Sequence, residues 1–262
     1  MKRIAAFIYG VVAYFVFFGT FCYLFAFVGD VFVPKSVNTD IETPVVQALL
    51  INLGLIALFG VQHSIMARPG FKKLWTRIVP KVIERSMFVL VTSVILIFMF
   101  WQWRPIAGTV WEVQNTFASA VIWAIFALGA LTVLTASFLI NHFDLFGLRQ
   151  VYLHLRSIDY TPLKFKERAL YRLVRHPLML GFLMAFWATP HMTVGHLVFT
   201  VGMTTYILIG IAFEERDLVR AHGQAYQNYR KRVPMLIPRP RVAKKSDVPE
   251  VLVPSQNQAE LR

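Results

Sequence analysis

Charged residues and cysteine are both scarce in this 262-residue chain. Charged residues make up 16% of the sequence, against about 25% in an ordinary soluble domain. The one cysteine, Cys22, excludes an internal disulfide and leaves the redox compartment open. Apolar residues reach 56%, with uninterrupted runs of about 20 residues. The composition therefore excludes a soluble globular protein and predicts an integral membrane protein.

Two other kinds of signal are missing. The first apolar run is too long for the apolar part of a signal peptide and no small-residue cleavage site follows it, so we expect a retained helix. The histidines have no neighbours at metal-ligand spacing, so we expect no metal site.

Six apolar segments divide the chain, and we expect each to be a helix because backbone groups in lipid must be hydrogen-bonded within their own segment. They cover residues 4–28, 44–66, 87–103, 117–140, 177–189 and 193–213. The predicted fold is an all-α polytopic membrane protein with five to six transmembrane helices. Residues 1–240 form one membrane-embedded domain, and the polar stretch 241–262 is expected to be disordered.

Acidic residues are few, 14 against 27 basic ones, and the basic residues are unevenly placed. The six helices put 25 of the 27 on one side, which the positive-inside rule assigns to the cytoplasm together with both termini. The net charge of +13 then reflects topology and contact with anionic lipid, and nothing in it indicates nucleic acid. Trp101 and Trp103 are predicted to form an aromatic belt at the outer interface.

The last two apolar segments form a hairpin with unequal arms, joined by a tight turn at Pro190 and His191. The first arm, from Pro177, spans only about 20 Å as a helix, whereas a bilayer core needs about 30 Å. Irregular backbone at that depth requires a covering of protein or a water-filled cavity. We therefore expect a pocket on the cytoplasmic side of this hairpin.

Polar and ionisable side chains gather at the predicted inner ends of four helices, and such groups in membrane segments mark function by default. Simpler interpretations remain for several of them. His63 could mark the lipid interface, Glu214 and Glu215 could form a structural ion pair with Arg172 or Arg175, and Pro177 could simply begin a helix. The gathered residues are Gln62, His63, Asn141, His142, Asp144, Arg175, His176, Pro177, Glu214 and Glu215.

The C-terminal third resembles the isoprenylcysteine carboxyl methyltransferases, integral membrane enzymes that use S-adenosylmethionine. The likeness covers about residues 168–240. Met179 stands where those enzymes commonly have tyrosine, which speaks against their prenylated substrate. The motifs that carry it are Arg175-His176-Pro177-x-x-x-Gly181, Glu214-Glu215-x-x-Leu218 and Gly223-x-x-Tyr226-x-x-Tyr229 with Pro234 and Pro238.

Over its whole length the chain is similar to the nurim-like membrane proteins. Two motifs carry this likeness, Gln62-His63-Ser64-x-Met66-Ala67 and Asn141-His142-Phe143-Asp144-Leu145-Phe146-Gly147. Within that group it most resembles bacterial enzymes that methylate methanethiol. The resemblance implies methyl transfer from S-adenosylmethionine to methanethiol, giving dimethyl sulfide. It also implies a location in the bacterial inner membrane, with the active site facing the cytoplasm.

The resemblance assigns a cofactor-binding role to residues of the C-terminal third, of which Tyr226 and Tyr229 match the cytoplasmic cap of the related enzymes. Arg175 joins them from chemistry, because a basic side chain can hold the carboxylate of S-adenosylmethionine while an acid holds its ammonium. The full predicted set is Arg175, His176, Pro177, Gly181, Glu214, Glu215, Tyr226 and Tyr229.

A thiol must become a thiolate to attack well, so a general base is expected, and histidine is the side chain best suited near neutral pH. His142 with Asp144 is the first choice and His63 the second. A helical pair at i and i+2 does not share a face, so His142 and Asp144 cooperate only if the helix has ended before them.

The predicted partners are a small volatile thiol and the lipid bilayer, and the sequence indicates no protein partner. Alternatives stay open: another thiol such as hydrogen sulfide, a prenylcysteine carboxylate or a lipid as acceptor, or a nurim-like membrane protein without enzymatic activity.

Overall fold

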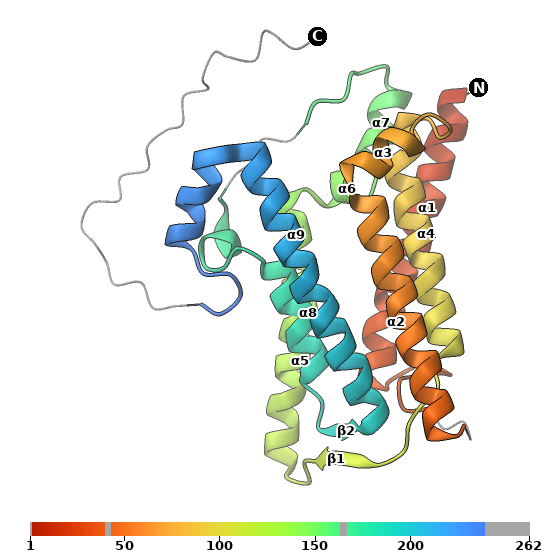
Figure 1. Ribbon diagram of the computed structural model, residues 1–262, viewed down its shortest axis with the longest axis vertical. Helices are drawn as coiled ribbons and strands as arrows, with labels where there is room; N and C mark the ends of the chain where they lie inside the picture. Colours follow the sequence, from red (N-terminus) through yellow and green to blue (C-terminus); the bar gives the residue numbers. More distant parts are fainter. Residues whose placement is uncertain (1, 40–42, 163–166, 239–262) are drawn as a thin grey trace.

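The computed structural model describes residues 2–39, 43–162 and 167–238. It confirms a membrane protein built almost entirely of helices (Figure 1). Within these residues five helices are long and apolar enough to cross a bilayer: α1 (Lys2–Gly29), α2 (Val45–Ala67), α4 (Lys81–Gln102), α5 (Thr116–Ile140) and α9 (Val194–Arg232). The predicted disordered tail, 241–262, lies outside the described residues.

Helix α9 extends well past the predicted end at residue 213, and its last part folds back on itself. The reversal occurs at Gly223, whose backbone has φ 53° and ψ −129°, a conformation that only glycine adopts without strain. In Figure 1 the residues beyond it turn away from the bundle and descend beside the short 3₁₀ helix η1 (Ala169–Arg172). This reversal brings the end of α9 back to the start of the preceding helix.

That preceding helix, α8 (Pro177–Trp187), is the short arm of the hairpin, and at 11 residues it is even shorter than predicted. It lies against α5 (Figure 1), and at one point the two backbones approach each other closely. A Cβ on Gly181 would come 2.6 Å from the carbonyl oxygen of Gly129, and a Cβ on Gly129 would come 2.7 Å from that of Gly181. Small residues that allow such close backbone approach are typical of helix pairs in membranes.

Gly181→Ala should therefore destabilise the protein, by about 1–3 kcal/mol, the usual cost of overpacking. Thermal unfolding in detergent measures the effect. Gly210→Ala on α9 is the matched control, because nothing lies within 4 Å of its added methyl group. Equal melting temperatures for the two variants would contradict this prediction, because they would show that α5 and α8 can move apart without loss of stability.

The end of the bundle that carries the two strands, which we call the outer end, differs from the prediction in two ways. Strand β1 (Thr109–Glu112) pairs antiparallel with β2 (His191–Thr193), so the predicted tight turn also contributes a strand. Trp101 is exposed as expected for a belt residue, but Trp103 is fully buried against Phe27 and Phe199. The prediction that Trp103 belongs to the belt was wrong, because the chain leaves α4 at Trp103 and turns inward.

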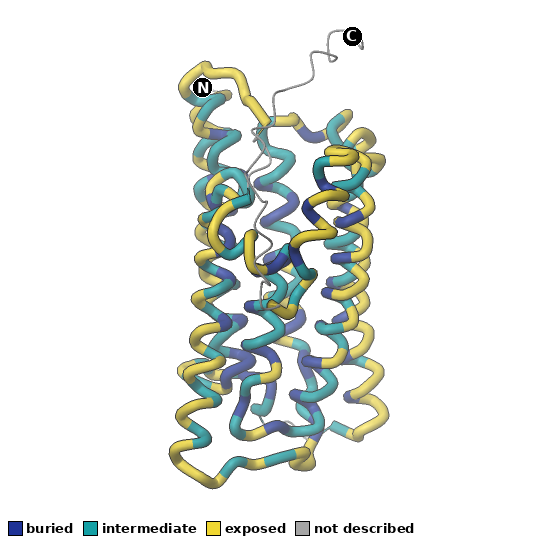
Figure 2. Tube along the Cα trace, turned by 90° about the vertical axis from the view of Figure 1, so that its left-hand side faces the viewer, coloured by how far each residue is buried: buried dark blue, intermediate teal, exposed yellow. Residues whose placement is uncertain are grey.

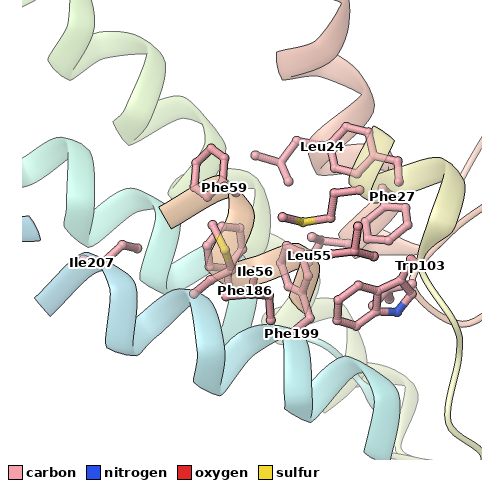
Figure 3. Packing of buried hydrophobic residues seen from close by; sticks show 14 of the residues in the cluster. Leu24, Phe27, Leu55, Ile56, Phe59, Trp103, Phe186, Phe199 and Ile207 are labelled. Carbon is pink, nitrogen blue, oxygen red and sulfur yellow. The ribbon is translucent and has the colours of Figure 1, made fainter. Parts of the chain in front are cut away.

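The main hydrophobic core lies between α1, α2, α4, α8 and α9, and its aromatic and aliphatic side chains interlock in Figure 3. Buried residues line the inside of the bundle and exposed ones its outside (Figure 2). Three short helices lie at the opposite end from the strands: α3 (Pro69–Trp75), α6 (His142–Leu145) and α7 (Leu148–Leu155). The first residues of α1 and the reversal in α9 lie at this same end, which we call the inner end.

Candidate functional site

A buried network of charged side chains joins the start of α8 to the inner part of α9. The Glu215 carboxylate accepts a hydrogen bond from Nε of Arg175 at 2.6 Å and lies 3.3 Å from Nε of Arg230. Nε2 of His176 is 3.3 Å from the same carboxylate. The side chains of Arg175 and Glu215 are each only 10% exposed. The structure thus confirms the predicted ion pair between Arg175 and Glu215.

This network forms because the chain after α9 returns to the short arm. The backbone N–H groups of Arg175 and His176 donate to the carbonyl oxygens of Pro234 and Met235, at 2.8 and 3.2 Å. The Arg175 guanidinium also donates to the carbonyl oxygen of Val233, at 2.6 Å. We call residues 233–238 the return segment. It supplies hydrogen-bond partners to the backbone just before α8 begins, at a depth where lipid would supply none.

Glu214 lies beside the network with its carboxylate half exposed. It is 3.5 Å from Nδ1 of His176, so the two carboxylates contact opposite nitrogens of one imidazole. Glu214 also acts on Tyr171 in η1, where burial and this neighbouring negative charge raise the pKa of the phenol. Tyr171 is therefore protonated at neutral pH. Glu214 is more exposed than Glu215, so it is the carboxylate of this network that a ligand can reach.

Two adjoining clefts open onto the network and share Arg230. The first, about 450 Å³, has the apolar side chains of α9 and Met235 on its walls and Glu215, Arg216 and Arg230 as its charged groups. The second, about 400 Å³, is lined by Arg175, Gln227, Arg230 and Lys231. Small-molecule sites usually measure about 300–1,000 Å³ and combine apolar walls with a few polar groups.

The other predicted residues of this region make structural contacts of their own, and their cofactor-binding roles stay predictions. Pro177 is the first residue of α8, as a helix-initiating proline would be. Tyr226 and Tyr229 are buried together beside Val233, and the Tyr229 hydroxyl donates to the carbonyl oxygen of Tyr171 at 2.6 Å. Gly181 lies at the contact between α5 and α8.

His63 faces α9 from a different side. Its Nδ1 is 2.6 Å from the Tyr206 hydroxyl, and its ring contacts Phe59 and Phe88. A Cβ on Gly60 would come 3.0 Å from the Tyr206 ring, so this glycine makes room for the tyrosine. Within the described residues, Nε2 of His63 forms no hydrogen bond. Nearer the inner end, Arg68 forms an ion pair with Asp217 at 2.9 Å.

His142 lies in a third place, against α1. Its Nδ1 is 2.8 Å from the Ser137 hydroxyl and its Nε2 is 2.9 Å from the Tyr14 hydroxyl. The ring stacks on Phe138 at 4.3 Å and is 4% exposed. Burial lowers the pKa of His142. Both ring nitrogens are therefore already engaged by hydroxyl groups of the protein.

Asp144 does not join His142 in this place. The helix does end before the pair, because Asn141 adopts φ 134° between α5 and α6. Asp144 nevertheless accepts hydrogen bonds from Arg149 at 2.8 Å and from the Tyr160 hydroxyl at 3.3 Å. In the described part of the chain, no hydrogen bond joins His142 to Asp144. The predicted catalytic roles of both residues stay predictions.

Two functional candidates were missed in the sequence, Arg230 and Tyr206. Arg230 belongs to a basic run that the topology argument used only for orientation. It reaches Glu215 only because Gly223 reverses the helix between them. Tyr206 is one of many aromatic residues in an apolar segment. Only its position opposite His63 distinguishes it from the others. That position cannot be known before the packing of α2 on α9 is known.

Comparison with known proteins identifies the family. The model of the NnrU protein family matches residues 50–243. A protein of Mycobacterium tuberculosis named methanethiol S-methyltransferase is 53% identical over 92% of this chain and 98% of its own length. One of the same name from Crocosphaera subtropica is 51% identical over 91% of this chain and 93% of its own length.

Mouse nurim is 27% identical over 68% of this chain and 70% of its own length. No solved structure matches the chain. These matches confirm the predicted nurim-like family. The likeness of the C-terminal third to the isoprenylcysteine carboxyl methyltransferases stays a prediction. The chain therefore belongs to the NnrU protein family, and relatives that share about half of its residues are named methanethiol S-methyltransferase.

Proposed function

We propose that this protein transfers a methyl group from S-adenosylmethionine to methanethiol, giving dimethyl sulfide. The names of its relatives support the reaction and the acceptor. The observation that carries it in this chain is the network of His176, Glu214 and Glu215 with two arginines beside the paired clefts. Relatives with the same name at this identity favour methanethiol over hydrogen sulfide, a prenylcysteine or a lipid.

The residues of the network fit the donor. S-adenosylmethionine supplies a methyl group on a positively charged sulfur, and it also carries an ammonium, a carboxylate and an adenine. Glu214, half exposed, offers negative charge to the cationic groups. Arg175 and Arg230 can hold a carboxylate, and the apolar wall of the first cleft suits an adenine.

We infer that His63 is the general base for the acceptor. A base needs a ring nitrogen that is free to take a proton. His63 keeps Nε2 for this purpose while Tyr206 fixes the ring through Nδ1. His142 has both nitrogens occupied and serves better as a packed link between α1 and α5.

Glu214 is the residue that brings donor and acceptor sides together in this proposal. It contacts His176 on the α8 side, and it is close enough to Tyr206 to interact with it electrostatically. Methyl transfer needs little covalent help from a protein, and holding the two sulfur atoms in line supplies most of the rate. The inner part of α9 is placed to do so.

The protein is an integral membrane protein, and we propose that its inner end faces the cytoplasm of a bacterium. The excess of basic residues at that end supports this orientation. The donor then reaches the clefts from the cytoplasm, and the volatile thiol reaches the site through the bilayer.

The test uses membranes containing the full chain, S-adenosylmethionine labelled on its methyl group, and separate thiol acceptors. We expect labelled dimethyl sulfide in the headspace with methanethiol. Labelled methanethiol formed from hydrogen sulfide, in the absence of methanethiol, would instead identify hydrogen sulfide as the acceptor. Failure of the purified wild-type protein to bind the donor would indicate a membrane protein without this activity.

A further inference from the structure

Arg85 is a cation at the inner end of α4 that the proposed site does not yet use. It is half-buried, and its Nε donates to the carbonyl oxygen of Leu145 at 2.7 Å. Its guanidinium lies over the ring of Phe88, 5.3 Å from the ring centre. This single hydrogen bond fixes the side chain and leaves the two terminal amino groups of the guanidinium free of hydrogen bonds to described residues.

The charge of Arg85 is not neutralised by a direct ion pair within the described residues. The nearest acids, Glu84 and Asp144, act on it only at longer range. Asp144 is already paired with Arg149 at 2.8 Å. A second cation, Lys72 of α3, lies close enough to repel Arg85. Leaving a half-buried charge unpaired is costly, so an unpaired cation at this position points to an anionic ligand.

Arg85 and the proposed base lie on the same aromatic ring. Phe88 contacts the guanidinium of Arg85, and its centre is also 5.0 Å from that of the His63 imidazole. Phe59 and Phe88 also contact the His63 ring, and Met66 packs against Phe88, so part of the wall around His63 is apolar. A cation, a base and apolar walls together fit a small alkyl thiolate, which carries one negative charge and one hydrocarbon group.

We infer that Arg85 binds the sulfur of the acceptor and stabilises it as the thiolate. This inference rests on the proposed function and adds a catalytic residue to it. The proton of the thiol moves to Nε2 of His63, and the thiolate sulfur forms a new bond to the methyl carbon. The bond between that carbon and the donor sulfur breaks, and its electron pair stays on the donor sulfur. The products are dimethyl sulfide, S-adenosylhomocysteine and one proton, which His63 returns to water.

The role of Arg85 matters because an alkyl thiol is mostly protonated at neutral pH. Its pKa lies above the value of about 8.5 for cysteine, so only a small fraction is thiolate. A neighbouring cation lowers the pKa of a thiol. Removing one charge-stabilising group from an enzyme site typically costs about 100- to 1,000-fold in rate. We expect a loss of this size in kcat/KM for methanethiol in Arg85→Gln.

Two measurements separate this role from a structural one. Arg85→Gln should bind S-adenosylmethionine as the wild type does, because the residue lies apart from the Glu215 network. With 2,2,2-trifluoroethanethiol, a larger thiol but a stronger acid than methanethiol, the loss relative to the wild type acting on the same thiol should shrink to about tenfold or less. The acidic limb of the pH profile with methanethiol should move to higher pH. The charged or titratable groups near His63 are Tyr206, Arg85, Lys72 and, through Tyr206, Glu214.

Lys81→Gln is the matched control, because Lys81 is an exposed cation one turn earlier on the same helix. It should keep wild-type kinetics. Arg85→Lys, which retains the charge, should recover part of the activity. If Arg85→Gln matches Lys81→Gln, or loses equally with both thiols, the inference is wrong. It is also wrong if Arg85→Gln loses donor binding. An inactive wild type would instead refute the proposed function.

Discussion

Glu215→Gln is expected to lose both donor binding and methyl transfer. Its carboxylate holds Arg175 at 2.6 Å and Arg230 at 3.3 Å, with Arg175 only 10% exposed. Removing one member of a buried ion pair leaves the partner charge uncompensated, at a cost of about 3–5 kcal/mol. Where the variant stays folded, the displaced arginines should hold the carboxylate of S-adenosylmethionine less well. We expect its affinity, measured by equilibrium binding in detergent, to fall by about 10- to 200-fold, the equivalent of one hydrogen bond to a charged group.

The matched control for Glu215 is Glu167→Gln. Glu167 also pairs with an arginine of this region, Arg232 at 2.9 Å, but Arg232 is 52% exposed. Exposed pairs contribute at most about 1 kcal/mol, so donor binding should change by less than about fivefold. If Glu215→Gln remains folded, as judged by its melting curve, and binds the donor like the wild type, the network is structural only.

His63→Gln is expected to keep donor binding and lose turnover. Loss of a general base typically reduces the rate by about 10²- to 10⁴-fold. The defect should diminish above about pH 8.5, where more of the thiol ionises without help. Initial rates of dimethyl sulfide formation between pH 6 and pH 10 measure both effects.

His191→Gln at the outer end is the control for His63, because His191 lies in β2 at the opposite end of the bundle. Its rates should match those of the wild type. The rate of Tyr206→Phe should fall about tenfold, because this substitution removes the hydroxyl that fixes the imidazole but leaves the base itself in place. A His63→Gln variant with unaltered rates at neutral pH would exclude His63 as the base. His142 would then be the remaining predicted base.

The membrane helices could be predicted from the sequence because each is a long apolar run with turn residues between. The predicted ends of α1, α2 and α5 fall within two residues of the structure. The short arm was also predictable, because a count from Pro177 to the turn is enough to show that it cannot cross a bilayer. Helix length is a local property that composition reveals.

The site was only partly predictable because it depends on how the helices are rotated. The sequence placed Glu215 near Arg175, and the structure confirms this pair. It also grouped His142 with the other polar helix ends, but the structure turns His142 towards Tyr14 of α1. In uniformly apolar helices the hydrophobic pattern does not mark one face, so rotation cannot be deduced from periodicity.

Contacts that need a change in chain direction were the least predictable. Arg230 pairs with Glu215 because Gly223 reverses α9. Trp103 enters the core because the chain turns inward at the end of α4. Strand β1 forms only because β2 lies opposite it at the outer end. Each depends on two segments far apart in the sequence.

The central claim is that α9 serves two neighbouring sites, a donor site around Glu215 and an acceptor site around His63. The most direct measurement compares S-adenosylmethionine binding and methyl transfer in Glu215→Gln and His63→Gln side by side. The account predicts that the first variant loses both and the second loses transfer alone. Loss of donor binding in His63→Gln, or wild-type binding in Glu215→Gln, would contradict it.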